Sequence, residues 1–167
     1  MGHSTRAFEA LLDLLRAWGV DLLVDVRTAA RSRRHPQFNA EALAEALPSR
    51  GIAYRRMPEL GGWRRPRADS PNTAWRNASF RGYADYMQTP GFEVALADLM
   101  SLSTAHTLAV MCAEAVPWRC HRSLIADALA ARGCDVRHIV SATKAEAHRM
   151  TPFARVEGAR VWYPGLV

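Results

Sequence analysis

Residues 21–26 read DLLVDV, a short and nearly continuous apolar run. Such a run predicts a strand that is buried on both faces, as the strands of a parallel sheet are. Just before it, apolar residues recur at helical spacing over residues 8–18, and Gly19 ends the pattern. Ser4 or Thr5 is the expected N-cap of that helix. The chain is therefore expected to enter its first visible strand from a helix.

Strand and helix continue to alternate after this strand. Asn39 is expected to cap a second helix, which leads to a strand at 52–57, and a central strand follows at 106–112. A helix at about 120–132 and a strand at 134–140 extend the pattern. This order predicts an α/β fold, in which a mostly parallel sheet carries helices on both faces.

The remaining segments are expected to be irregular or short. Residues 58–78 are rich in Pro, Gly, Arg and Asn without periodicity, which predicts a long loop. Two helices are predicted after it, at 79–88 and 92–102. The tail ARVEGARVWY, residues 154–163, predicts a small C-terminal hairpin. Because we find no repeat and no linker, we predict a single α/β domain over residues 1–167.

Composition excludes several classes of protein. The 167 residues include 49% hydrophobic and 23% charged residues, the balance of an ordinary globular protein. No apolar run approaches the roughly 20 residues of a membrane span, and the first residues have no signal-peptide pattern, so we expect a cytoplasmic protein without a membrane partner. The three cysteines are an odd number, which favours free thiols or metal ligands over disulfides.

The basic residues are almost all arginines. The formal net charge is +6, and Lys144 is the only lysine. Two arginine-rich stretches, at 27–35 and 55–67, have Phe38, Trp63, Trp75 and Phe80 among or beside them. Basic loops with interleaved aromatic residues are one way to hold a single-stranded or flipped nucleotide. A solvated surface, or a coding sequence that favours arginine, explains the same pattern.

Reactive side chains follow the predicted strands. Because ligands of parallel sheets bind outside the carboxyl ends of the strands, such residues are expected to meet at one edge. In chain order they are Asp25 and Arg27, then Glu59, Gly61 and Gly62, then Cys112 and Glu114, and finally Ser141 and Thr143. His3 and Ser4 stand at the matching point before the first helix. We expect one concave site lined by His3, Asp25, Arg27, Glu59, Cys112, Glu114 and His121.

The most informative segment is CAEAVPWRCHR, residues 112–122. It joins a buried strand to a helix, whose N-terminal N–H groups favour anions and lower the pKa of a nearby thiol. It is similar to the anion-cradling loops of rhodanese-type sulfurtransferases and cysteine phosphatases, although six residues instead of five separate Cys112 from Arg119. A metal site of Cys112, Cys120 and His121 is a second interpretation. An ordinary buried strand cysteine is the third, and Cys134 is expected to be structural.

Five motifs together resemble a known family. They are GHSTR (2–6), VDVRTAARSRRHPQFN (24–39), ELGG (59–62), WRNASFRGYADYM (75–87) and MCAEAVPWRCHR (111–122). In this order they resemble the bacterial proteins grouped as Domain of Unknown Function 488. The resemblance implies a strand before the GHS turn, which we expect to be missing from this sequence, and it brings no reaction with it. The motifs point to His3, Asp25, Arg27, Arg33, Asn39, Glu59, Gly61, Gly62, Asn77, Tyr83, Cys112, Glu114, Cys120, His121 and Arg122.

The leading hypothesis is an enzyme that acts on an anionic, phosphate-bearing substrate such as a nucleotide or nucleic acid. Its expected catalytic residues are Asp25, Cys112, Glu114, Cys120 and His121. Its expected substrate-binding residues are His3, Ser4, Arg27, Arg31, Arg33, Arg34, Asn39, Glu59, Gly61, Gly62, Asn77, Tyr83 and Arg122. A non-catalytic nucleic-acid-binding module that uses the arginine loops is one alternative. A small protein that binds a divalent metal through Cys112, Cys120 and His121 is the other.

Overall fold

Three parallel strands form the centre of the protein. The computed structural model describes residues 1–165. The sheet order is β2–β1–β3, and its strands are β1 (Leu22–Asp25), β2 (Ala53–Arg56) and β3 (Leu108–Met111). Both neighbours of β1 run parallel to it. The predicted parallel sheet is therefore confirmed for these strands.

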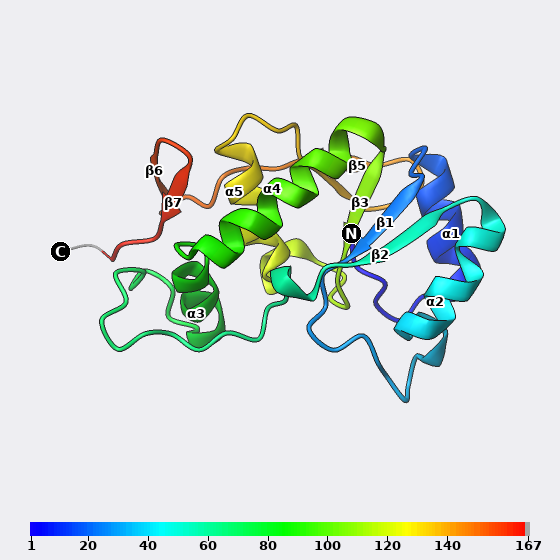
Figure 1. Ribbon diagram of the computed structural model, residues 1–167, viewed down its shortest axis with the longest axis horizontal. Coiled ribbons are helices and arrows are strands. Elements are labelled where there is room, and N and C mark those ends of the chain that lie inside the picture. Colours follow the sequence, from blue (N-terminus) through cyan, green and yellow to red (C-terminus); the bar gives the residue numbers. More distant parts are fainter. Residues whose placement is uncertain (166–167) are drawn as a thin grey trace.

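Helices cover both faces of this sheet, as predicted. Figure 1 shows α1 (Phe8–Ala17) and α2 (Ala40–Ala46) on one side. On the other side are α4 (Pro90–Ala105) and α5 (Arg122–Ala130), with α3 (Ala78–Tyr86) farther from the sheet. The sheet thus separates two apolar layers.

The side chains of β1 alternate between these two layers. Leu23 packs in the core with Leu11 of α1 and Leu43 of α2. Its neighbour Val24 packs in the opposite core with Leu124 of α5. Since successive side chains of a strand point to opposite faces, a continuous apolar run requires an apolar partner on each face. The helices on both sides provide those partners.

The prediction that residues 134–140 add a further strand to the parallel sheet is wrong. Residues Arg137–Ile139 form β4, but β4 pairs antiparallel with β5 (Ala145–Ala147) in a separate hairpin. Ser141 lies in the connection, and its carbonyl oxygen accepts a hydrogen bond from Trp18 Nε1 at 2.9 Å, near the start of β1. Ser141 and Thr143 therefore do not reach the carboxyl edge of the sheet. The short turn closed by Val140 N–H and the Lys144 carbonyl returns the chain too soon for a parallel strand.

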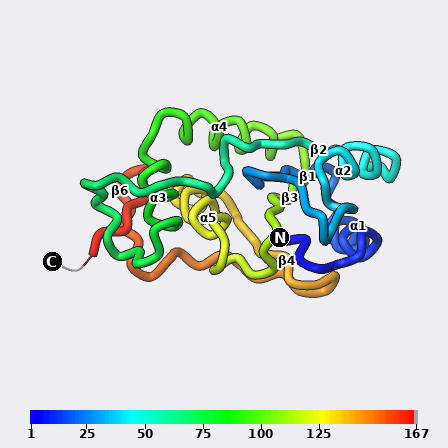
Figure 2. The backbone as a smooth tube through the Cα atoms, turned by 90° about the horizontal axis from the view of Figure 1, so that it is seen from below, coloured from blue at the N-terminus to red at the C-terminus, as the bar shows by residue number. Residues whose placement is uncertain are grey.

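The C-terminal hairpin is confirmed. It consists of β6 (Arg155–Glu157) and β7 (Arg160–Trp162), which pair antiparallel. Gly158 in its turn has φ +61°, a conformation that favours glycine. Figures 1 and 2 both place this hairpin near α3, at the end of the molecule away from α1 and α2.

The long arginine-rich loop before α3 is held by one buried carboxylate. Asp85 of α3 accepts hydrogen bonds from Arg67 N–H at 2.8 Å, Ser70 Oγ at 2.6 Å and Asn72 Nδ2 at 2.8 Å. Asp85 is 5% exposed and Asn72 is fully buried. These bonds give the loop a defined path across the molecule without regular secondary structure.

Residues 1–4 extend the sheet beside the end of β3. Gly2 forms a parallel bridge with Cys112, and His3 N–H donates to the Cys112 carbonyl at 3.0 Å. The strand expected before this segment stays a prediction. The expected cap of α1 by Ser4 or Thr5 is wrong, because Ala7 occupies the N-cap position. Ser4 has φ +51° and donates its N–H to the Ala113 carbonyl instead. Among the helices of residues 1–165, none is long and apolar enough to cross a bilayer.

Candidate active site

A pocket of about 360 Å³ opens where β1 and β3 end and α5 begins. Its lining includes Arg27, Cys112, Glu114, Arg119, Cys120 and His121. These residues come from the segments that follow β1 and β3, which is the edge expected for a ligand site in a parallel sheet. The pocket therefore gathers four of the five residues expected to be catalytic, all except Asp25.

The Cys120 sulfur lies among polar groups at this pocket. Its sulfur accepts a hydrogen bond from Arg122 Nε at 3.3 Å, and His121 Nδ1 lies 3.6 Å away. The nearby Cys112 thiol, together with the interactions with His121 and Arg122, lowers the pKa of Cys120 against the opposing effect of burial. The nearby Cys120 sulfur, together with burial, raises the pKa of Cys112. The pair thus favours a thiolate at Cys120 beside a protonated Cys112.

His121 is oriented by the end of β1. Its Nε2 lies 3.3 Å from the Val26 carbonyl oxygen, and its ring packs against Tyr83 with centroids 5.0 Å apart. A carbonyl only accepts, so in the neutral ring Nε2 carries the proton and Nδ1 presents its lone pair to Cys120. A thiol, an adjacent base and a third group that orients the base form the arrangement of an activated nucleophile.

Gly62 makes room for this imidazole. A β-carbon built at residue 62 would overlap the ring of His121 at Nδ1, Cγ and Cε1. The second glycine of the ELGG motif is therefore a close-approach residue, and its role is to let the loop after β2 pass over His121.

Replacing Gly62 with alanine should slow the alkylation of Cys120 by about 10-fold or more, because a displacement near 1 Å can cost up to about 100-fold in a positioned group. Measurement of the iodoacetamide reaction at Cys120 by mass spectrometry checks this. Gly91→Ala is the matched control, since a β-carbon there meets only ordinary van der Waals contacts. Equal rates in wild type and Gly62→Ala would contradict the role given to Gly62.

Arg122 connects the thiol to the loop after β3. It is 5% exposed, and its Nη2 donates to the backbone carbonyl of Glu114 while its Nε donates to Cys120. Gly2 lies directly against the same carbonyl, where a β-carbon would overlap it. The Glu114 side chain is exposed and lines the pocket. Arg122 is thus a positioning residue, buried behind the sulfur.

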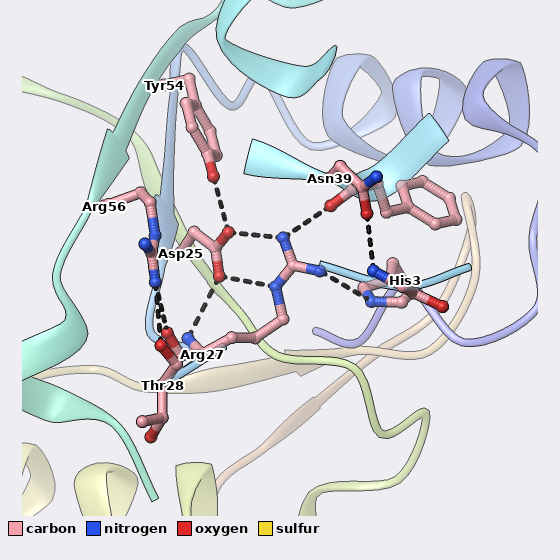
Figure 3. Close-up of polar contacts among 9 residues, drawn as sticks. His3, Asp25, Arg27, Thr28, Asn39, Tyr54 and Arg56 are labelled. Atoms are coloured by element: carbon pink, nitrogen blue, oxygen red, sulfur yellow. Dashed lines mark hydrogen bonds and ion pairs between the residues drawn. The ribbon is translucent and has the colours of Figure 1, made fainter. Parts of the chain in front are cut away.

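A buried ion pair supports the pocket from the β1 side (Figure 3). Asp25 accepts from Arg27 Nε at 2.8 Å, from Arg27 Nη2 at 2.6 Å and from Tyr54 Oη at 2.6 Å. Arg27 also donates to the Phe38 carbonyl at 2.7 Å, and its Nη1 lies 3.3 Å from His3 Nε2. Asp25 is fully buried, and Arg27 and His3 are each 4% exposed.

Asp25, the last residue of β1, and Arg27, two residues later, lie in different places relative to the pocket. Burial and the hydrogen bond to Asp25 raise the pKa of Tyr54, so its phenol remains a donor. Burial opposes the charge of Arg27, but the hydrogen bond to Asp25 outweighs it and the pKa of Arg27 is raised. Arg27 lines the pocket, whereas Asp25 and His3 lie outside its lining. Asp25 therefore holds Arg27 and the following loop in place.

One family model matches most of the chain. The chain matches the family described as Domain of unknown function DUF488 over residues 7–129. The chain belongs to this family. No curated protein matches it, and no solved structure matches it. The matched region of this DUF488 protein runs from just before α1 nearly to the end of α5 and includes all the pocket residues named above.

The arginine loop of this DUF488 protein lies beside the pocket. Arg31 is exposed and pairs with Glu41 at 3.0 Å, and Arg33 and Arg34 are exposed as well. Asn39 stands at the N-cap position of α2, but the predicted side-chain cap is wrong. Its Oδ1 accepts from Ser32 N–H at 2.6 Å, which closes the loop on itself. Nucleic-acid binding by this loop stays a prediction.

The other predicted binding residues of the DUF488 motifs have structural contacts. Asn77 caps α3 by accepting from two backbone N–H groups. Tyr83 donates to the Leu60 carbonyl at 2.8 Å, and a β-carbon at Gly61 would overlap Thr28. The Glu59 side chain is exposed and lies outside the pocket lining.

Three polar residues of the pocket were missed by the sequence-based list of site residues. Thr28, Ser79 and Arg119 line the pocket with exposed side chains. Thr28 directly follows Arg27, and Ser79 lies within the motif at 75–87, so the same strand-end and motif arguments could have included them. For Arg119, the sequence offers only its spacing from Cys112 as a signal.

Proposed function

We propose that this DUF488 protein is an enzyme that transfers a group from an anionic substrate to the thiolate of Cys120. One observation carries the proposal: Cys120 lines the pocket, and its sulfur accepts a hydrogen bond from Arg122 Nε and lies 3.6 Å from His121 Nδ1. A cysteine that accepts a hydrogen bond from a guanidinium and has a base beside it is a stronger nucleophile near neutral pH than an ordinary buried thiol.

The proposed step is a nucleophilic displacement. The Cys120 sulfur forms a bond to the electrophilic atom of the substrate while the bond to the leaving group breaks. The leaving group takes the bonding electron pair and receives the proton that His121 Nδ1 took from the Cys120 thiol. Water or a second substrate then takes the transferred group from sulfur, and its proton returns to His121. Glu114, which lines the same pocket, would be the carboxylate that assists these proton transfers.

The preference for an anion rests on Arg119. This side chain is exposed and lines the pocket, and it has no carboxylate partner within residues 1–165. The neighbouring hydroxyls of Thr28 and Ser79 add hydrogen-bond donors. A guanidinium with hydroxyl groups beside it suits a phosphate or another oxyanion.

The charge preference is tested by comparing two alkylating agents at Cys120. Iodoacetate carries a negative charge and iodoacetamide does not, so Arg119→Gln should lower the ratio of their rates about 3- to 5-fold, the effect of roughly 1 kcal/mol between charges in water. Arg33→Gln, which removes an equal charge outside the pocket, should leave the ratio unchanged. An unchanged ratio in Arg119→Gln would remove the basis for an anionic substrate.

A bound metal ion is a second candidate function. The ligand atoms of Cys112, Cys120 and His121 all lie within 4.8 Å of one another. Two thiolates and an imidazole, with a fourth position open to the pocket, are the ligand set of a catalytic zinc site. This function requires both cysteines to be thiolates, whereas the proposed enzyme keeps Cys112 protonated.

A further inference from the structure

A second polar network lies away from the thiol pocket. Asp127 of α5 is fully buried and accepts from His148 Nε2 at 2.7 Å. It also accepts from Tyr163 Oη at 2.7 Å and Thr151 N–H at 3.0 Å. His148 Nδ1 in turn lies 2.9 Å from His138 Nε2. A carboxylate and two imidazoles thus form a continuous chain that ends at His138 in β4.

Asp127 determines which ring nitrogens of His148 and His138 carry protons. A carboxylate only accepts, so His148 Nε2 carries a proton and its Nδ1 is an acceptor when the ring is neutral. His138 must then donate from Nε2, which leaves the lone pair on His138 Nδ1. No group within residues 1–165 forms a hydrogen bond with that atom, and the atom is not fully buried. Burial and the nearby His148 lower the pKa of His138 to about 4, so Nδ1 remains an acceptor at neutral pH.

His138 and His148 line a pocket of about 810 Å³ with aromatic walls. Trp118 and Phe153 contribute to these walls and are 68% and 39% exposed. Trp75 also lines the pocket, and its indole N–H is buried without a partner in the part of the chain that the structure describes. The site combines flat apolar surfaces with the side chain of His138, which also borders a second pocket of about 450 Å³.

We propose that this pocket binds a planar nitrogen heterocycle of the nucleobase type. The ring would stack on Trp118 and Phe153, and an N–H at its edge would donate to His138 Nδ1. Stacking recognises any flat ring, but the acceptor held by the Asp127–His148 chain selects one that carries an N–H donor. The site does not depend on the thiol chemistry, because its residues are separate from Cys120 and His121.

The two pockets are nevertheless neighbours. Trp118 lines the aromatic pocket, and the next residue, Arg119, lines the thiol pocket. Trp75 stacks on Phe80 with ring centroids 4.8 Å apart, and Phe80 lines the thiol pocket. A heterocycle in the aromatic pocket would therefore lie beside the site proposed for the anionic group.

Calorimetric titration of the full chain with adenosine tests the proposal, since its exocyclic amino group is the required donor. We expect binding at millimolar or lower concentration and a loss of affinity of about 10-fold or more in Trp118→Ala. Trp63→Ala is the matched control, because Trp63 is 76% exposed but lines the thiol pocket. It should bind adenosine as wild type does.

His138→Phe keeps an aromatic ring and removes the acceptor. It should weaken adenosine binding and leave the weak binding of benzyl alcohol, which lacks an N–H, unchanged; a thermal melt verifies that the variant is folded. The proposal is overturned if adenosine does not bind at 5 mM, taken as roughly the weakest useful limit, or if Trp118→Ala binds it as wild type does. Benzyl alcohol binding as tightly as adenosine would also overturn it.

Discussion

Arg27→Met should lower the free energy of unfolding by about 3–5 kcal/mol, because it removes one partner of a buried ion pair and leaves a buried charge without compensation. Asp25 is fully buried, and two of its strongest hydrogen bonds come from Arg27. Only Tyr54 Oη and the backbone N–H of residue 27, which lies 3.1 Å from Asp25 Oδ1, would then donate to the carboxylate. Urea denaturation monitored by circular dichroism measures the change.

Two variants make this prediction specific. Arg31→Met breaks an ion pair whose members are 78% and 71% exposed, and it should cost less than about 1 kcal/mol. Asp25→Leu combined with Arg27→Met removes both charges, and it should recover part of the loss because apolar replacement of a buried pair is often neutral. A cost below about 1 kcal/mol for Arg27→Met would show that the pair does not support the loop after β1.

The three cysteines should differ in reactivity, and Cys120 should react with iodoacetamide at pH 7 about 10-fold or more faster than Cys134. An ordinary thiol with a pKa near 8.5 is only about 3% thiolate at that pH, whereas the contacts of Cys120 stabilise its thiolate. Cys112, whose pKa is raised, should react most slowly. Peptide mass spectrometry over a time course measures the three rates in one sample.

The same experiment separates the enzyme from the metal-binding candidate. A bound zinc ion would protect Cys112 and Cys120 together until a chelator is added, and metal analysis would find about one equivalent. Cys134→Ser is the control, since Cys134 takes no part in either site and its loss should not change the other rates. Slow, equal and chelator-independent labelling of all three cysteines would contradict both candidates.

Local sequence pattern was sufficient to predict the parallel sheet, the helices on both of its faces and the C-terminal hairpin. Continuous apolar runs such as 21–26 require burial on both faces, and helical spacing at 8–18 supplies the layer that buries one of them. Because parallel strands end at a common edge, the sequence also indicated that Arg27, Cys112 and Glu114 would meet. These features depend on residues close together in the chain.

Only the tertiary structure decided what each reactive residue faces. Asp25 and Arg27 are two residues apart, yet Tyr54 and the Phe38 carbonyl hold their ion pair so that Arg27 lines the pocket and Asp25 does not. The return of β4 onto β5, and the contact between Gly62 and His121, likewise join segments whose pairing no local pattern specifies. Periodicity records which face of an element is buried, whereas the partner on that face is chosen by packing and hydrogen bonding between distant segments.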